Sequence, residues 1–266
     1  MKQLTYISLL MMLLVSGLAG CGSQPTTNHL QAIRLGGMIK VGASADYPPF
    51  EYLASDGKKV GFDIALMEEI ARRLNVKLEW ADIPFDSLID AVKAGKIDLA
   101  ISAFNYSLER ALEIDFSDPY YLSEDVLVVT NQFSGTIAAP LDVARYQVGV
   151  HSGSTQENWL VENLVKAGKL PEANLFRYER ADQAAEELRI GRIEVWMADN
   201  VTAQVFADQV GNLKTVYEGT LSGGPLHIVL RKDDQSLKAE INRIVQVLES
   251  QGFIKQLALQ YIAGIK

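Results

Sequence analysis

DSLIDAVKAGKIDLAISAFN, at residues 86–105, returns in pattern as DQAAEELRIGRIEVWMADN, at residues 182–200. The two stretches align at a constant offset of 96 residues, which pairs Asp86 with Asp182 and Gly95 with Gly191. In each, an Asp suited to a helix N-cap is followed by a helical stretch, a glycine suited to the helix end, and an apolar strand. Other helix–glycine–strand units share some of these features, but the match favours two lobes of similar build over one sheet.

Short apolar runs alternate with amphipathic stretches along the rest of the chain, from about residue 39 onward. This alternation is typical of βαβ units, so we expect an α/β fold with largely parallel sheets. Strands are expected at 39–44, 76–81, 97–102, 125–130, 146–151, 174–178, 193–198, 213–218 and 226–231. The clearest helices are expected at 63–74, 85–95, 154–168 and 182–191.

The lobe boundaries are placed where this alternation breaks. We expect lobe 1 to contain residues 37–127 and 223–266, and lobe 2 to contain residues 128–222, so that the chain crosses twice between them. Two crossings form a hinge, and a hinge between two α/β lobes leaves a cleft. Ligands of open α/β sheets bind beyond the carboxyl ends of the strands, which directs attention to the residues at those ends.

The N-terminal segment differs from the rest of the chain. Residues 1–20 begin with one lysine, continue with a Leu- and Met-rich run and end in small residues, so we expect a secretion signal. LAGC, at residues 18–21, resembles a bacterial lipobox, which implies cleavage before Cys21 and a membrane-anchoring lipid on its sulfur. Cys21 is the only cysteine, which excludes an internal disulfide. Residues 21–36 are expected to form a flexible tether.

Composition narrows the classes of function. The chain has 266 residues, 48% of them hydrophobic, which is enough for one large core or two small ones. Its formal net charge of −8 does not favour nucleic acid or an anionic membrane surface as a partner. Beyond the N-terminal segment there is no apolar run of about 18 residues, so no membrane-spanning helix is expected. Three scattered histidines and one cysteine indicate no metal site, no catalytic nucleophile and no cofactor.

Polar residues near the strand ends favour a zwitterionic ligand. Arg110 can bind a carboxylate through two parallel hydrogen bonds, and the Gly-Ser turn before Thr155 can offer backbone N–H groups to the same anion. Asp199 follows an apolar strand, where a carboxylate needs a positive partner, although it could equally cap the next helix. A carboxylate and an ammonium on one carbon define an amino acid, and charges met from both lobes would favour closure.

Several motifs together resemble a known family. Over residues 37–262 the chain resembles the bacterial extracytoplasmic solute-binding proteins of family 3, the amino-acid type. The motifs are VGASADYPPFEY (41–52), GFDIALMEEIA (61–71), GKIDLAIS (95–102), SLERALEIDFSDPYY (107–121), VGVHSGSTQEN (148–158) and GRIEVWMADNVTA (191–203). The resemblance implies a periplasmic-binding-protein-like type II fold, in which two lobes joined by two hinge crossings close on the ligand. It also implies a monomeric receptor that hands a polar amino acid to an ABC permease.

The same resemblance implies roles for individual residues. Arg110 matches the arginine that binds the ligand carboxylate, and Asp199 matches the aspartate that takes the ammonium. Thr155 matches a carboxylate contact. The other expected ligand positions are Gln156 beside Thr155, Ala103 and Asn105 at the amino-acid head, and Tyr47, Phe85, Ser44 and His151 toward the ligand side chain.

Departures from the family pattern leave the ligand side chain open. Ser44 stands where many relatives have Asp, which weakens the case for arginine or lysine, although Asp46 could substitute for it. Asn105 stands where Ser or Thr is common. His151 either reaches the side-chain pocket or is an ordinary loop histidine. A basic, a polar or a broad preference is therefore compatible with the sequence.

Two classes of function compete. The first is a binding protein, which needs neither a catalytic group nor a cofactor. The second is an enzyme, since the same scaffold hosts cyclohexadienyl dehydratases, which use an acid in the cleft to drive loss of water. That chemistry needs a cleft carboxyl with a raised pKa, and Asp199 is the only candidate that the sequence offers.

Overall fold

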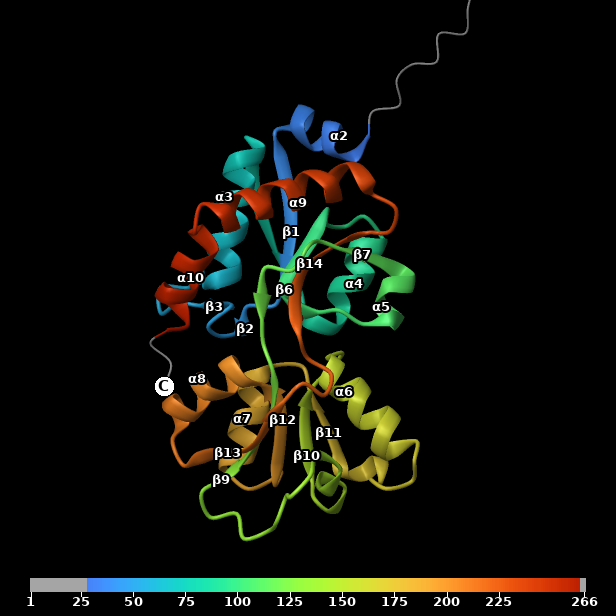
Figure 1. Cartoon of the computed structure of the whole chain (residues 1–266), viewed down its shortest axis with the longest axis vertical. Helices are drawn as coiled ribbons and strands as arrows, with labels where there is room; N and C mark the ends of the chain where they lie inside the picture. Colours follow the sequence, from blue (N-terminus) through green and yellow to red (C-terminus); the bar gives the residue numbers. More distant parts are fainter. Residues whose placement is uncertain (1–27, 264–266) are drawn as a thin grey trace, which may run out of the picture.

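The computed structural model describes residues 28–263. The expected signal segment, Cys21 and residues 21–27 of the expected tether therefore lie outside the described residues. The described chain forms two α/β lobes, which lie one above the other in Figure 1. Between residues 28 and 263, no helix is long and apolar enough to cross a membrane.

Lobe 1 is built on a six-stranded sheet with the order β5-β1-β6-β14-β7, and β8 pairs with β14. β1 is parallel to β5 and β6, whereas β14 is antiparallel to β6, β7 and β8. The strands are β1 (Met38–Ala43), β5 (Lys77–Asp82), β6 (Leu99–Asn105), β7 (Ile114–Phe116), β8 (Tyr121–Leu122) and β14 (Pro225–Arg231). A small antiparallel sheet contains β2 (Asp46–Tyr47), β3 (Glu51–Leu53) and β4 (Lys59–Val60). The helices are α2 (His29–Gly36), α3 (Phe62–Leu74), α4 (Phe85–Lys93), α5 (Leu108–Glu113), α9 (Gln235–Ser250) and α10 (Phe253–Tyr261).

Lobe 2 repeats the same plan in a five-stranded sheet with the order β11-β10-β12-β9-β13. β10 is parallel to β11 and β12, and β9 is antiparallel to β12 and β13. The strands are β9 (Asp125–Thr130), β10 (Val148–His151), β11 (Leu175–Tyr178), β12 (Val195–Asp199) and β13 (Leu213–Gly219). The helices are α6 (Thr155–Leu160), α7 (Ala181–Arg189) and α8 (Asn200–Val210), with shorter turns η1 (Pro140–Arg145), η2 (Val161–Val165) and η3 (Glu172–Asn174).

The internal match in the sequence corresponds to this shared plan. α4 followed by β6 in lobe 1 occupies the position of α7 followed by β12 in lobe 2. Gly95 and Gly191, at φ 66° and φ 77°, adopt the left-handed conformation that ends each helix. The expectation of largely parallel sheets was only half right. In each large sheet three neighbouring strands are parallel, but the next strand, β14 in lobe 1 and β9 in lobe 2, runs antiparallel to them.

The expected N-cap roles of Asp86 and Asp182 were wrong. The two helices begin one residue earlier, at Phe85 and Ala181, so both aspartates lie in the first helical turn. The backbone N–H of Ala181 is instead bound by Asp46, a carboxylate of lobe 1.

The chain passes between the lobes twice, in the green segment that leads into β9 and the orange segment that leads into β14 in Figure 1. The boundary expected at residue 128 lies inside β9, which joins the lobe 2 sheet from Asp125 onward. The expected tether also ends earlier than residue 36, because α2 begins at His29 after the cap Asn28.

α2 is tied to lobe 1 by His29. Its Nε2 lies 2.9 Å from Asp98 Oδ1, and its Nδ1 is hydrogen-bonded to Asp234. These two carboxylates hold the pKa of His29 above its ordinary value, with the Asp98 hydrogen bond as the largest cause. Ile33 of the same helix is buried, so an apolar contact adds to the ionic one.

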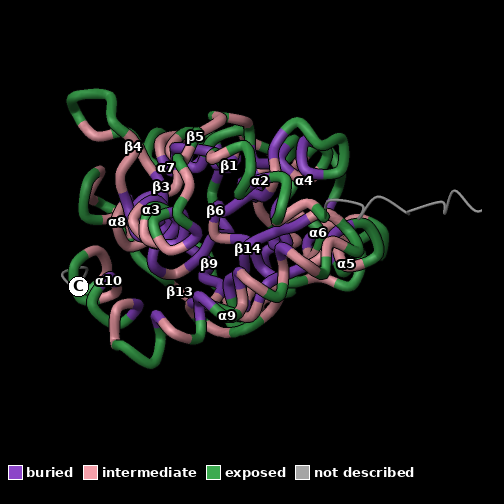
Figure 2. Tube along the Cα trace, turned by 90° about the horizontal axis from the view of Figure 1, so that it is seen from above, coloured by how far each residue is buried: buried purple, intermediate pink, exposed green. Residues whose placement is uncertain are grey.

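Apolar side chains cover both faces of each sheet. In lobe 1, one cluster packs under α3, α9 and α10 and another under α4, and in lobe 2 the two clusters lie under α6 and under α7 with α8. Figure 2 shows buried segments running through the strands and exposed segments on the outer turns. Both sheets are thus rigid supports, and each places the carboxyl ends of its parallel strands at the gap between the lobes.

Candidate functional site

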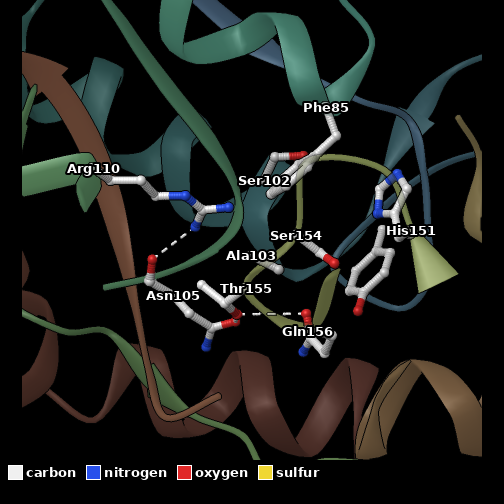
Figure 3. A pocket seen from close by; sticks show the side chains of 10 residues that line it. Phe85, Ser102, Ala103, Asn105, Arg110, His151, Ser154, Thr155 and Gln156 are labelled. Atoms are coloured by element: carbon white, nitrogen blue, oxygen red, sulfur yellow. Dashed lines mark hydrogen bonds between the residues drawn. The ribbon is translucent and has the colours of Figure 1, made fainter. Parts of the chain in front are cut away.

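A small cavity lies where strand ends of the two lobes meet. Its volume is about 10 Å³, roughly the space of one water. It is lined by Tyr47, Phe85, Ser102, Ala103, Asn105, Arg110, His151, Ser154, Thr155 and Gln156, most of which are labelled in Figure 3. Eight of the ten residues predicted from the sequence are therefore brought together here. The other two, Asp199 and Ser44, do not line the cavity.

Arg110 carries the positive charge of the cavity. Its side chain starts on α5, whose N-cap is Ser107, and its guanidinium extends inward over the rings of Phe85 and Phe104, at 5.6 and 5.4 Å. Nη1 donates to Asn105 O at 2.9 Å, and Nη2 donates to Gly153 O of lobe 2 at 2.7 Å. Arg110 thus joins the two lobes.

The guanidinium of Arg110 is hydrogen-bonded to backbone carbonyl oxygens and to no carboxylate of the described chain. Burial lowers the pKa of Arg110 to about 10. Arg110 is half-buried, and a partly desolvated cation whose protein partners are neutral is stabilised by an anion that can enter the same space. The cavity is therefore suited to a carboxylate.

Lobe 2 contributes the start of α6, where side chains already bind two of the backbone N–H groups. The N–H of Gly153 is taken by the Glu157 carboxylate at 2.7 Å, and Ser154 caps α6 by accepting from Glu157 N. The hydroxyl of Thr155 lies 3.4 Å from Asn105 Oδ1 across the cleft. Gln156 donates to Asp125 at 2.8 Å, which anchors the start of α6 to the first crossing.

Three rings form the other end of the cavity. His151 stacks on Tyr47, with centroids 5.7 Å apart, and lies 5.0 Å from Phe85. Its Nε2 is 3.2 Å from Glu179 O, and a carbonyl only accepts, so this nitrogen carries the proton. Burial lowers the pKa of His151, against the opposing effect of Asp46, whose Oδ2 is 4.0 Å from Nε2. His151 is thus part of the cavity wall.

Asp199 is placed at the end of β12 as the N-cap of α8. Its Oδ1 accepts from Val201 N at 2.9 Å and from Thr202 N at 3.4 Å. Burial raises its pKa to about 6. Its charge also contributes to the raised pKa of Tyr47, so the carboxylate lies beside the cavity wall without forming part of it.

Ser44 is hydrogen-bonded to Asp46 and does not line the cavity. Its hydroxyl donates to Asp46 Oδ1 at 2.6 Å, and Asp46 Oδ2 accepts from Ala181 N of lobe 2 at 2.9 Å. Ser44 lines a separate groove between the lobes together with Glu179 and Arg180.

Sequence reasoning missed Ser102 and Ser154 as cavity-lining residues and Asp46 as a contact between lobes. Ser102 ends the predicted strand at 97–102, and Ser154 precedes the predicted anion-binding helix, so their positions carried a signal. The partner of Asp46 is 135 residues away in sequence, and no local pattern indicates such a contact. Within residues 28–263, no group of three or more His, Cys, Asp or Glu side chains is arranged to hold a metal ion.

Comparison with known proteins identifies the family. Residues 39–264 match the family described as bacterial extracellular solute-binding proteins, family 3. The chain belongs to this family. This family 3 protein is 30% identical over 224 residues to a probable histidine-binding protein of Campylobacter jejuni. The alignment covers 84% of each of the two chains.

Solved structures of similar proteins agree with this assignment. A mutant of ArgBP from T. maritima superposes with a TM-score of 0.80 and 32% identity, covering 87% of this family 3 chain and 98% of the other. An ancestral amino acid-binding protein, described as a precursor of cyclohexadienyl dehydratase, gives a TM-score of 0.78 and 28% identity over 88% of this chain and 99% of the other. The two-lobed fold described above is thus the fold of family 3 solute-binding proteins.

Proposed function

We propose that this chain is an extracytoplasmic receptor that binds an amino acid between its lobes and delivers it to an ABC permease. The observation that carries the proposal is the half-buried guanidinium of Arg110 at the interface of the lobes, whose hydrogen-bond partners among residues 28–263 are backbone carbonyl oxygens. Family membership supports an amino acid as the ligand, as do the ligands named for relatives, histidine for the Campylobacter jejuni protein and arginine for an ancestral arginine-binding protein.

The ligand carboxylate binds Arg110 and the hydroxyl of Thr155. The ammonium binds Asp199, whose burial-raised pKa of about 6 would fall on contact with a cation. Asn105 and Ala103, at the end of β6, hold the head group from lobe 1. Gln156 fixes the turn that carries Thr155.

The ligand side chain lies against Tyr47, Phe85 and His151. Asp46 accepts a hydrogen bond from Ser44, and its Oδ2 lies 4.0 Å from His151 Nε2. It thus places a negative charge close to this end of the cavity. We therefore place side chains with hydrogen-bond donors above acidic ones in the order of preference.

Binding requires the lobes to separate and close again. An amino acid is larger than the present cavity of about 10 Å³, so the ligand enters when the lobes part at the two crossings. The proposed lobe 1 contains residues 28–124 and 225–263, and lobe 2 contains residues 125–224. The receptor is a monomer held at the membrane by a lipid on Cys21. A Cys21→Ala chain that still fractionates with membranes would contradict the anchoring.

The experiment is thermal unfolding of the full chain with each of the twenty amino acids. A ligand that binds only the native state raises the midpoint. For the ligand so found, Arg110→Ala is expected to weaken binding at least about 100-fold, because loss of a buried charge partner costs about 3–5 kcal/mol. Arg72→Ala is the matched control, since its side chain is 70% exposed and pairs with Glu69 on the outer surface. Equal affinity of Arg110→Ala and the parent would refute the site.

A dehydratase remains the second candidate function because of one observation, the buried Asp199 with a pKa near the physiological range, about 6. Its capping bonds to α8 favour a binding role. Incubation with prephenate, followed by ultraviolet detection of an aromatic product, separates the two functions. Turnover that disappears in Asp199→Asn would favour the enzyme, and a midpoint rise with amino acids without turnover favours the receptor.

A further inference from the structure

Two carboxyl groups are completely buried behind the cavity wall. Glu51, on β3, and Asp63, in the first turn of α3, have no exposed surface. Burial is the largest factor that raises the pKa of each, and for Glu51 the charge of Asp63 adds to it. The other titratable groups that face the pair are Tyr120, Tyr47 and Asp46, none of which is a cation.

Each carboxyl has one oxygen that is well bonded and one that is not. Glu51 Oε1 accepts from the Ser102 hydroxyl at 2.6 Å, and Asp63 Oδ2 accepts from Ala103 N and from the Tyr120 hydroxyl, both at 2.8 Å. Glu51 Oε2 and Asp63 Oδ1 are buried without any donor from the described chain. The two side chains are close enough to hydrogen-bond to each other and to feel each other's charge, so two charged carboxylates here would be strongly unfavourable. One proton between the two free oxygens removes one charge and gives both a partner.

We propose that Glu51 and Asp63 share a single proton, and that the hydrogen-bonded pair fixes the Ser102–Ala103 end of β6 where it lines the ligand cavity. Asp63 is the charged member, because it already accepts two hydrogen bonds and lies in the first turn of α3, where the helix favours an anion. Glu51 carries the proton and donates it to Asp63.

The backbone of Ala103 explains why this support is needed. Ala103 has a φ of 47°, in the left-handed region that non-glycine residues avoid. Its N–H is held by Asp63 and the preceding Ser102 hydroxyl by Glu51. Glu51 and Asp63 are therefore positioning residues, which act on the cavity through Ser102 and Ala103 and do not touch the ligand.

The first test is the pH dependence of stability, measured by urea unfolding of the full chain. A carboxyl whose pKa is raised in the folded state stabilises the protein fully below the ordinary Glu pKa of about 4.5. This stabilisation is lost as the pH rises toward the folded-state pKa. Above about pH 6, where Asp63 is ionised, and up to the folded-state pKa of Glu51, the native parent therefore holds one more proton than the unfolded chain. In that range its unfolding constant rises about tenfold per pH unit through this pair. Glu51→Gln, which keeps a neutral donor, is expected to lose that tenfold dependence.

The control variant is Glu79→Gln, whose side chain is 48% exposed at the surface of β5. It is expected to keep the pH slope of the parent. A Glu51→Gln protein with the parental slope would overturn the shared proton. If Glu51→Gln does not fold, infrared spectra of the parent decide the question, since a protonated carboxyl gives a C=O stretching band at neutral pH. Absence of that band in the parent overturns the proposal.

The positioning role is tested by binding of L-arginine and L-histidine, and this step rests on the proposed function. Glu51→Ala, which leaves the Ser102 hydroxyl without its acceptor and Asp63 Oδ1 without a donor, is expected to weaken binding at least tenfold, and Glu51→Gln to restore it. Parental affinity in Glu51→Ala overturns the positioning role. If the parent binds neither amino acid, the proposed function is wrong for these ligands, whereas the pH slopes still decide the shared proton.

Discussion

Replacing Asp46 with asparagine is expected to weaken closure of the lobes. Asp46 is a lobe 1 residue with a fully buried side chain, and it accepts the N–H of Ala181 at the start of α7 in lobe 2. Its negative charge thus meets the positive end of a lobe 2 helix only when the lobes are in contact. Asp46→Asn keeps an acceptor for this N–H but removes the charge.

The size of the effect follows from these contacts. A charge near a helix terminus contributes up to about 2 kcal/mol in a partly buried site. The retained amide oxygen preserves a neutral hydrogen bond, so we expect a loss of about 1–2 kcal/mol in favour of the open form. This corresponds to a 5- to 30-fold lower ratio of closed to open molecules, and to the same loss in ligand affinity if only the closed form binds tightly.

Closure can be measured by energy transfer between dyes placed one on each lobe. The matched control is Asp182→Asn, because Asp182 lies in the first turn of the same helix but pairs with Arg180 within lobe 2. Asp182→Asn is expected to leave the closed fraction unchanged. An unchanged closed fraction in Asp46→Asn, or an equal decrease in both variants, would refute the role of Asp46 as a contact that favours closure.

Two further predictions concern stability. The pKa of His29 is raised by its two carboxylate partners. The stabilisation that protonated His29 gives the folded state is therefore fully present below about pH 6.5 and is lost as the pH rises through its folded-state pKa. Urea unfolding should therefore show His29→Ala to be less stable than the parent at low pH and the gap to narrow at high pH; a gap that widens with pH would contradict this. Gly61→Ala is expected to cost about 3 kcal/mol or more, because its φ is 131° and an added Cβ would lie 2.2 Å from Phe50 O. Gly57→Ala, at φ 80° with nothing within 4 Å, should cost only about 1 kcal/mol, and equal losses in the two variants would show that the clash is unimportant.

Local sequence patterns predicted the elements of the fold well, and for an identifiable reason. The match between residues 86–105 and 182–200 depends on helix period, a left-handed glycine and an apolar strand, all of which are short-range properties. The same patterns misplaced the helix caps, because Asp86 and Asp182 resemble N-caps whereas helix starts are also fixed by partners from elsewhere, such as Asp46.

The candidate site was predicted partly from chemistry and mainly from family resemblance. Arg110 is one arginine among many in the sequence, and only the order of the surrounding motifs singled it out. Ser44 was expected in the pocket because of its position in the family pattern, but its hydroxyl is used by Asp46 two residues later. The Glu51–Asp63 pair was not predicted, because its existence depends on the packing of β3 against α3 and not on any local pattern.

The position of β14 affects the order in which the protein can be completed. β14, at residues 225–231, lies between β6 and β7 in the lobe 1 sheet, whereas all five strands of the lobe 2 sheet come from the continuous stretch 125–219. Lobe 2 can therefore assemble from adjacent segments, but lobe 1 must bring together segments more than 100 residues apart, and such contacts form slowly. During synthesis the N-terminal half therefore lacks an inner strand of its sheet until nearly the whole chain has been made, so lobe 2 can be complete before lobe 1 is.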